Sequence, residues 1–125
     1  MSVGIAAGWN AGVRQLTRRE AAAASIYTTG NAQRANITLP DGSTVALNVA
    51  SRLEVPADYM TGDHTVHLVG EGLFTVVRHE STPFAVEAGT TTTRVLGTRF
   101  VVRHYPSDSA TMVAVQDGKV AVRSV

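Results

Sequence analysis

The sequence predicts an all-β fold, and three observations lead to this class. From Ile26 onward, apolar residues recur at every second position in short runs, which is the period of a half-buried strand. Residues that favour tight turns separate these runs, most clearly at Asp41-Gly42 and Asp117-Gly118. About ten such runs follow one another at the spacing of an antiparallel sandwich or barrel. We therefore expect consecutive antiparallel hairpins that form a sandwich, a roll or a barrel-like body, preceded by a short N-terminal helix or arm.

The bulk composition limits the classes of protein to which the chain can belong. It has 125 residues with a net charge of +1, and 17% of the residues are charged. This length fits one domain with a real core, and the near-neutral charge does not point to nucleic acid as a partner. The chain has no cysteine, so it forms no disulfide and offers no thiolate to zinc. We expect residues 26–125 to form one β domain behind an arm of residues 1–25.

The arm carries different signals from the rest of the chain. Thr17 and Glu20 have the spacing of a capping box ahead of an alanine run, which favours a short helix or a frayed arm. Arg14, Arg18 and Arg19 could form a basic patch, but three arginines near a terminus are more simply interpreted as solvated charge. No apolar run approaches the ~18 residues of a membrane span, and the start lacks the features of a signal peptide.

The first hairpin is centred on Pro40, Asp41 and Gly42. Proline fixes φ, aspartate bonds its own backbone and glycine adopts a positive φ, so these residues predict a tight turn. Apolar residues alternate with polar ones on both sides of this turn. The strands expected in the first half of the chain are residues 26–28, 35–39, 44–49 and 52–55, and a loop follows over residues 58–63.

The second half of the chain predicts two more hairpins. Residues 65–69 and 73–78 flank Gly70-Glu71-Gly72, and residues 112–115 and 120–122 flank Asp117-Gly118. Between these hairpins, strands are expected over residues 83–88 and from 91 to 105. Gly97 interrupts the second of them, which indicates a bulge, a sharp bend or a close approach of backbone.

Few residues have the spacing that catalysis needs. Ser43 and Ser51 lie in or near turns without the Gly-x-Ser-x-Gly pattern of a nucleophile elbow. Glu71 lies between two glycines, where it could act as a general acid or base. A turn carboxylate that accepts backbone N–H bonds is the simpler interpretation. We expect no catalytic residue, no cofactor-binding residue and no enzymatic activity.

The histidines do not form a metal-binding pattern. His64 and His67 are three positions apart, and on a strand such positions point to opposite faces. His79 and His104 lie elsewhere in the chain, so we expect no metal site.

The aromatic residues divide between core and surface. Phe74, Phe84 and Phe100 fall at inward positions of expected strands, which indicates core packing rather than a stacking platform for sugars or bases. Tyr59 lies in a loop and is the best candidate for an exposed aromatic contact.

Several landmarks follow one another in a set order between residues 27 and 122. They are Leu39-Pro40-Asp41-Gly42-Ser43, then Gly70-Glu71 with Phe74, then Pro83-Phe84, then Gly97-Thr98 with Phe100, and finally Asp117-Gly118. In this order and spacing they resemble the FecR family of periplasmic sensor domains, which occur in iron-responsive anti-sigma regulators. The resemblance implies that these motif residues have structural roles.

The resemblance also implies a three-part relay. In such proteins a cytoplasmic segment holds a sigma factor, one helix crosses the inner membrane, and the β domain lies in the periplasm. A C-terminal receptor-contacting part commonly follows the β domain and meets the signalling domain of an outer-membrane TonB-dependent transporter. This chain resembles the middle part, so residues 1–25 are expected to be a juxtamembrane linker and residues 26–125 the periplasmic domain. No nucleic acid is expected as a partner.

The expected function is therefore protein interaction in transmembrane signalling. We expect the contact at the edge of the last hairpin (residues 112–122) or of the first strand (residues 26–29), because an edge strand offers unpaired backbone groups. The alternative is a glycan- or ligand-binding structural β module of the cell envelope.

Overall fold

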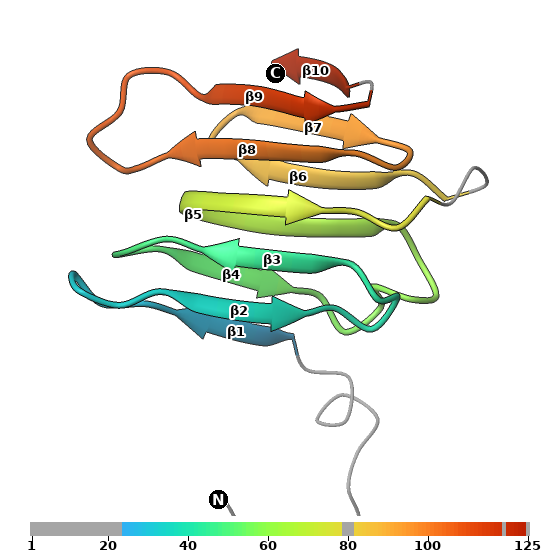
Figure 1. Cartoon of the computed structure of the whole chain (residues 1–125), viewed down its shortest axis with the longest axis horizontal. Coiled ribbons are helices and arrows are strands. Elements are labelled where there is room, and N and C mark those ends of the chain that lie inside the picture. The colour runs from blue at the N-terminus through green and yellow to red at the C-terminus, as the bar shows by residue number, and fades with distance from the viewer. Residues whose placement is uncertain (1–23, 79–81, 119, 125) are drawn as a thin grey trace, which may run out of the picture.

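A computed structural model describes residues 24–78, 82–118 and 120–124, and this part of the chain contains ten strands and no helix. Figure 1 shows the strands stacked in two layers that run from β1 at one end to β10 at the other. The all-β prediction is confirmed. The expected N-terminal helix or arm, with Arg14, Arg18 and Arg19, and also His79, lies outside the described residues. The strands are β1 (Ser25–Thr28), β2 (Ala35–Thr38), β3 (Thr44–Leu47), β4 (Arg52–Val55), β5 (His64–Thr75), β6 (Phe84–Ala88), β7 (Thr91–Val95), β8 (Arg99–His104), β9 (Met112–Asp117) and β10 (Val120–Ser124).

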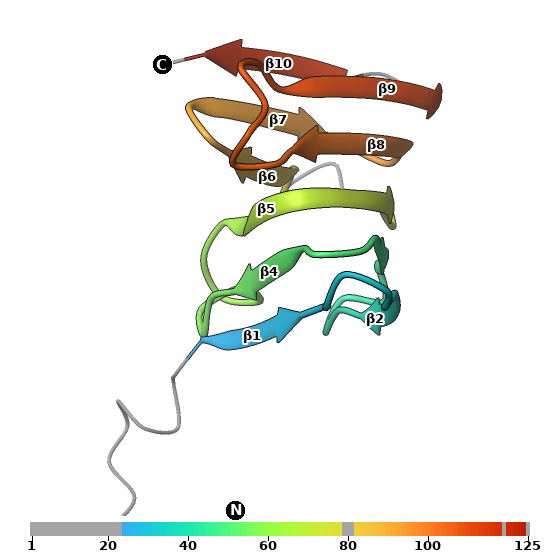
Figure 2. The same cartoon turned by 90° about the vertical axis from the view of Figure 1, so that its left-hand side faces the viewer.

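Two sheets share the strand β5. The long sheet has the order β1-β4-β5-β6-β7-β10, and the short sheet has the order β2-β3-β5-β8-β9. The first half of β5 pairs with β4 and β6 in the long sheet, and residues 70–75 pair with β8, and in part with β3, in the short sheet. The turned view in Figure 2 shows the two sheets facing each other. The architecture is therefore an open sandwich that is held together by one strand common to both layers.

The expected hairpin around Gly70-Glu71-Gly72 is wrong, because β5 runs without reversal from His64 to Thr75. Gly70 lies at the point where β5 leaves the long sheet, and its φ is 110°. A Cβ at this position would lie 2.8 Å from the Cα of Ser51 and closer still to the Ser51 side chain. The glycine is needed because the strand bends against Ser51, and not because the chain turns back.

The expected third hairpin is also wrong. β9 pairs with β8 and β10 pairs with β7, so the turn at Asp117-Gly118 carries the chain from the short sheet to the long one. A similar crossing at Gly97 connects β7 to β8, and a Cβ there would lie 2.7 Å from the Cβ of Arg78. This confirms the expected bend and close approach. β5 and β6 are moreover parallel, so the long sheet is mixed, and the consecutive strands β1/β2 and β3/β4 do not pair with each other. The first hairpin, β2 with β3, is confirmed.

The core fills the space between the sheets and is centred on three phenylalanines. Phe74 and Phe100 stack with their ring centroids 5.3 Å apart, and Phe84 packs against both at 5.8 and 6.5 Å. All three are almost completely buried, as expected from their inward positions. Burial of each such side chain contributes about 1.5–3 kcal/mol to folding. The remaining core is mainly aliphatic side chains from the inner faces of both sheets.

Candidate protein-interaction site

The first family motif builds a closed turn between β2 and β3. Gly42 has a φ of 91°, and Asp41 accepts a hydrogen bond from the backbone N–H of Ser43 at 3.0 Å. The Ser43 hydroxyl donates to the second carboxylate oxygen of Asp41 at 3.1 Å and accepts from the N–H of Val77 at 3.0 Å. Ser43 has no exposed surface, and its hydroxyl joins this turn to the residues that follow β5.

The second motif supports the bend in β5. The Ser51 hydroxyl accepts the N–H of Glu71 at 3.0 Å and donates to the carbonyl of Val49 at 2.8 Å. Tyr105 donates to the same carbonyl at 2.7 Å. The Glu71 carboxylate accepts a hydrogen bond from the side-chain amide of Asn48 at 2.7 Å. Ser51 and Glu71 are therefore parts of one polar network that holds the crossing strand. The Glu71 carboxylate accepts from the side-chain amide of Asn48 in this network, whereas the sequence favoured backbone N–H donors at a turn.

The last motifs secure the crossings between the sheets. Gly118 has a φ of 103°, and a Cβ there would lie 2.7 Å from the Thr98 hydroxyl oxygen. Thr98 is buried, and its carbonyl accepts the N–H of Val76 at 2.9 Å. Pro83 directly precedes β6 and leads Phe84 into the core. The motif residues thus lie at turns, crossings and core positions.

The histidines lie in separate environments. His64 is buried, with its Nδ1 3.8 Å from an Asp41 carboxylate oxygen. His67 is half exposed on the outer face of the long sheet, where its Nδ1 lies 3.0 Å from a Glu87 carboxylate oxygen. The two side chains therefore point to opposite faces, as their spacing predicted. Within the described ranges, no group of three or more His, Asp or Glu side chains is placed to hold a metal ion.

The prediction of an exposed contact at Tyr59 is wrong. Only 1% of Tyr59 is exposed, and its ring stacks on that of His64 with the centroids 4.8 Å apart. The ring also packs edge-on against Phe84 at 6.3 Å. Among the described residues its hydroxyl has no hydrogen-bond partner, and burial, together with the nearby charge of Asp41, raises the pKa of Tyr59. The loop folds inward because this ring closes one end of the core, which the loop sequence did not indicate.

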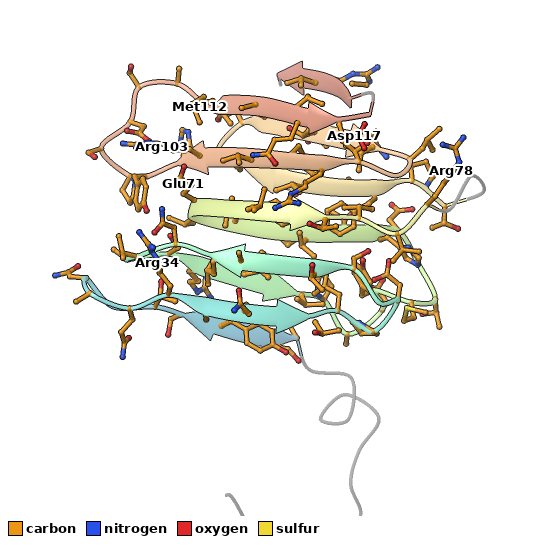
Figure 3. All side chains as sticks on the ribbon, in the orientation of Figure 1. Arg34, Glu71, Arg78, Arg103, Met112 and Asp117 are labelled. Carbon is orange, nitrogen blue, oxygen red and sulfur yellow. The ribbon has the colours of Figure 1, made fainter. Side chains whose placement is uncertain are left out.

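One end of the outer face of the short sheet carries charged side chains beside the exposed Met112. Figure 3 shows Glu71, Arg103 and Met112 at the same end of β5, β8 and β9, with Arg34 nearby. The Nε of Arg103 lies 3.3 Å from Asp108, which also accepts the Tyr105 N–H at 2.8 Å. The Tyr105 N–H and the Arg103 guanidinium lower the pKa of the Asp108 carboxyl. These charges therefore have partners within the domain.

Strand edges are the exposed features that can pair with another protein. In the described part of the chain, β1 and β10 form the two edges of the long sheet, and β2 and β9 form those of the short sheet. Both regions expected from the sequence, residues 26–29 and 112–122, thus lie at sheet edges, although the second comprises edges of two different sheets. Large apolar side chains are exposed on both, including Ile26 on β1 and Met112 on β9. No helix that is long and apolar enough to cross a membrane occurs among the described residues.

Comparisons with known proteins agree with these landmarks. Residues 25–121 match the family described as FecR protein. Two crystal structures of a candidate anti-sigma factor from Parabacteroides distasonis ATCC 8503 are similar, at 32% sequence identity and TM-scores of 0.77 and 0.76. The matches cover 81% and 80% of this chain but 47% of each solved chain, so this chain spans about half the length of those proteins. A comparison with curated protein sequences gives no match. The extent of the family match and the motif residues at the turns of this fold show that the chain belongs to the FecR family.

Proposed function

We propose that this chain is the signal-receiving β domain of a membrane-anchored anti-sigma regulator. In this proposal residues 26–125 lie in the periplasm, and residues 1–25 link them to an anchor in the inner membrane. A cytoplasmic segment of the same protein holds a sigma factor. The input comes from the signalling domain of an outer-membrane TonB-dependent transporter that carries an iron chelate. The domain itself performs no reaction.

The observation that carries the proposal is the FecR match over residues 25–121, because it covers nearly all of the β domain. The similarity to candidate anti-sigma factors supports the same role. The geometry also supports a role without catalysis, since the hydroxyls of Ser43 and Ser51 are engaged in hydrogen bonds within the domain. What the domain presents to a partner is its strand edges, and backbone groups at an edge can be completed by a partner strand.

A reporter strain tests the role of the domain. The gene for a fluorescent protein is placed under a promoter of the controlled sigma factor, and the regulator is expressed either intact or without residues 25–121. We expect the iron chelate to induce the reporter only with the intact regulator, because the shortened one has no signal-receiving domain. Immunoblots of membrane fractions control for the amount of regulator. Normal induction by the shortened regulator would contradict the proposal.

A pull-down tests the contact with the transporter. The purified signalling domain of the transporter is immobilised, and the chain is applied as wild type or with lysine substitutions along both candidate edges. We expect wild-type binding and its loss in at least one edge variant. Binding that survives charge substitution on every edge would remove the edge proposal.

The alternative, a glycan- or ligand-binding module, would use the shallow depression on the outer face of the short sheet. This depression has a volume of about 230 Å³ and is lined by Arg34, Asn48, Glu71 and Leu73, among others. Arg34 Nε donates to the Asn48 side chain at 3.0 Å, and Asn48 in turn donates to Glu71. The polar groups of this depression are thus already hydrogen-bonded to each other. They are less available to a ligand, which favours the signalling proposal. Co-sedimentation with purified peptidoglycan, lost in Arg34→Ala, would favour the alternative.

A further inference from the structure

The three arginines that precede the β domain are not explained by the proposed function. Residues 1–24 contain Arg14, Arg18 and Arg19 but only one acidic residue, Glu20, so this part of the chain has a net charge of +2. Residues 25–125 contain eight basic and nine acidic residues, which gives a net charge of −1. The arm and the domain thus carry opposite charges, and the arginines are attracted to any acidic side chains of the domain that lie within their reach.

A hollow in the β domain lies beside the point where the arm joins it. It has a volume of about 470 Å³, and the end of β4 and the loop after it supply most of its lining. Its lining residues are Ala24, Glu54, Pro56, Ala57, Asp58 and Thr61. Ala24 directly precedes β1, and Figure 2 shows β1 next to β4 at one end of the stack. The chain therefore enters the fold at the rim of this hollow.

The hollow is acidic. Glu54 and Asp58 carry its charges, and its other lining residues are uncharged. Residues 53–63 contain three acidic residues and no basic one. One Glu54 carboxylate oxygen lies 3.9 Å from Arg52, which is a loose pair, and among the described residues no cationic side chain pairs with the Asp58 carboxylate. Both carboxylates can therefore accept a further cation.

The arm arginines are close enough in the sequence to occupy the hollow. Arg19 lies five positions before Ala24, and five residues span at most about 18 Å when extended and about 7.5 Å in a helix. Because Ala24 itself lines the hollow, either conformation leaves the Arg19 guanidinium within reach of the carboxylates. The covalent connection also favours this occupant over a separate molecule, because a tethered segment has an effective concentration in the millimolar range.

We propose that residues 14–23 lie in this hollow, with Arg18 and Arg19 paired with Glu54 and Asp58. The alanines of residues 21–23 are small enough to lie against the uncharged part of the lining. The contact fixes the direction in which the chain leaves the start of β1. In the proposed regulator, this direction sets how the domain is held relative to its membrane anchor. The contact itself is made within this chain and does not depend on the proposed function.

Paramagnetic relaxation in NMR spectra of the full chain tests this contact. The sequence contains no cysteine, so a nitroxide attached to Gln15→Cys is the only label. We expect this label to broaden the amide signals of residues 54–61. Exposed ion pairs are weak and are screened by salt. The broadening should therefore fall by about twofold or more between 0.01 and 1 M salt, over which the Debye length shortens from about 30 to about 3 Å.

Exchange of the charges identifies the residues that form the contact. Arg18→Glu with Arg19→Glu should reduce the broadening to its high-salt level, and so should Glu54→Lys with Asp58→Lys. All four substitutions together should restore it, because opposite charges then face each other again. The matched control is Glu87→Lys, which changes an exposed acid elsewhere on the outer face of the long sheet and should have no effect. Circular-dichroism melts verify that each variant is folded, and Asp58→Asn removes one charge with little change of shape.

Three outcomes would overturn the proposal. The first is broadening of residues 54–61 that survives reversal of both arm arginines, or that Glu87→Lys reduces as much as Asp58→Asn does. The second is broadening that arises between labelled and unlabelled copies in a mixture, because the occupant would then be the arm of a second copy. The third is an arm that leaves these amides unaffected but binds vesicles of anionic lipid through its arginines. Each of these outcomes would leave the signalling function intact, because the experiment involves neither a transporter nor a sigma factor.

Discussion

Ser51→Ala is the substitution that best tests how the bend in β5 is held. The Ser51 side chain is 4% exposed and is the partner of the Glu71 N–H at 3.0 Å. Alanine removes this acceptor and leaves the N–H without a partner next to Gly70, where the strand changes sheets. The Val49 carbonyl is less affected, because the Tyr105 hydroxyl still donates to it at 2.7 Å. The loss of stability therefore comes mainly from one backbone N–H, that of Glu71, which is left without an acceptor.

The expected loss of unfolding free energy follows from the unsatisfied Glu71 N–H. A buried N–H left unsatisfied costs about 1–3 kcal/mol, and we expect about 2 kcal/mol for Ser51→Ala. This is a large part of the roughly 5–15 kcal/mol that stabilises a typical domain. For a domain of this size each kcal/mol lowers Tm by about 4–8 °C, so the expected fall is about 8–16 °C.

Urea unfolding followed by circular dichroism measures the change, with Tyr105→Phe as the matched control. The control also removes a hydroxyl that bonds to the Val49 carbonyl, but it leaves every backbone donor satisfied, so its cost should be about 1 kcal/mol or less. If Ser51→Ala destabilised the domain no more than Tyr105→Phe, Ser51 would not be the support of the bend. The reasoning about the second family motif would then be refuted.

Two further predictions concern the same frame. Gly70→Ala should lower the free energy of unfolding by at least about 3 kcal/mol and reduce the yield of folded protein, because a φ of 110° is strained for alanine and its Cβ would meet Ser51. The control in the same melts is Gly30→Ala. It should be nearly neutral, because the atom nearest to the added Cβ belongs to the flexible Gln33 side chain. Tyr59→Phe should leave stability at pH 7 unchanged or higher, because the hydroxyl has no hydrogen-bond partner in the part of the chain that the structure describes, and should reduce the loss of stability above pH ~10. The raised pKa keeps Tyr59 protonated in the folded state while the unfolded chain ionises, so stability falls as pH rises. Equal slopes of unfolding free energy against pH in both proteins would contradict this.

Local patterns were sufficient for the strands and the first turn. Alternation of apolar and polar residues placed strands close to their observed bounds, and Pro40-Asp41-Gly42 forms the expected turn because its backbone preferences are local. The inward positions of Phe74 and Phe100 followed from the same alternation. The glycines of the family motifs were visible for a related reason, since Gly42, Gly70 and Gly118 have a positive φ and a Cβ at Gly97 would meet Arg78.

These local patterns did not indicate which strands pair or which side chains that are distant in the sequence lie in contact. Gly70-Glu71-Gly72 and Asp117-Gly118 have the composition of hairpin turns, yet the first is a bend and the second a crossing between sheets. Tyr59 is in a loop as expected, but its burial depends on His64 and Phe84, which only the folded chain brings to it. In each case the deciding contact joins residues that are distant in the sequence or belong to different sheets.

The amino-acid sequence alone determined that this protein is built of short strands, where most of them lie, that Pro40-Asp41-Gly42 forms a turn, and that three phenylalanines lie in the core. These properties depend on backbone preferences and on the period of side-chain direction along a strand, both of which act within a few residues. The tertiary structure decided which strands pair and that β5 serves both sheets. Pairing is decided by the packing of two whole sheets around one core, and that free energy is not a property of any single segment.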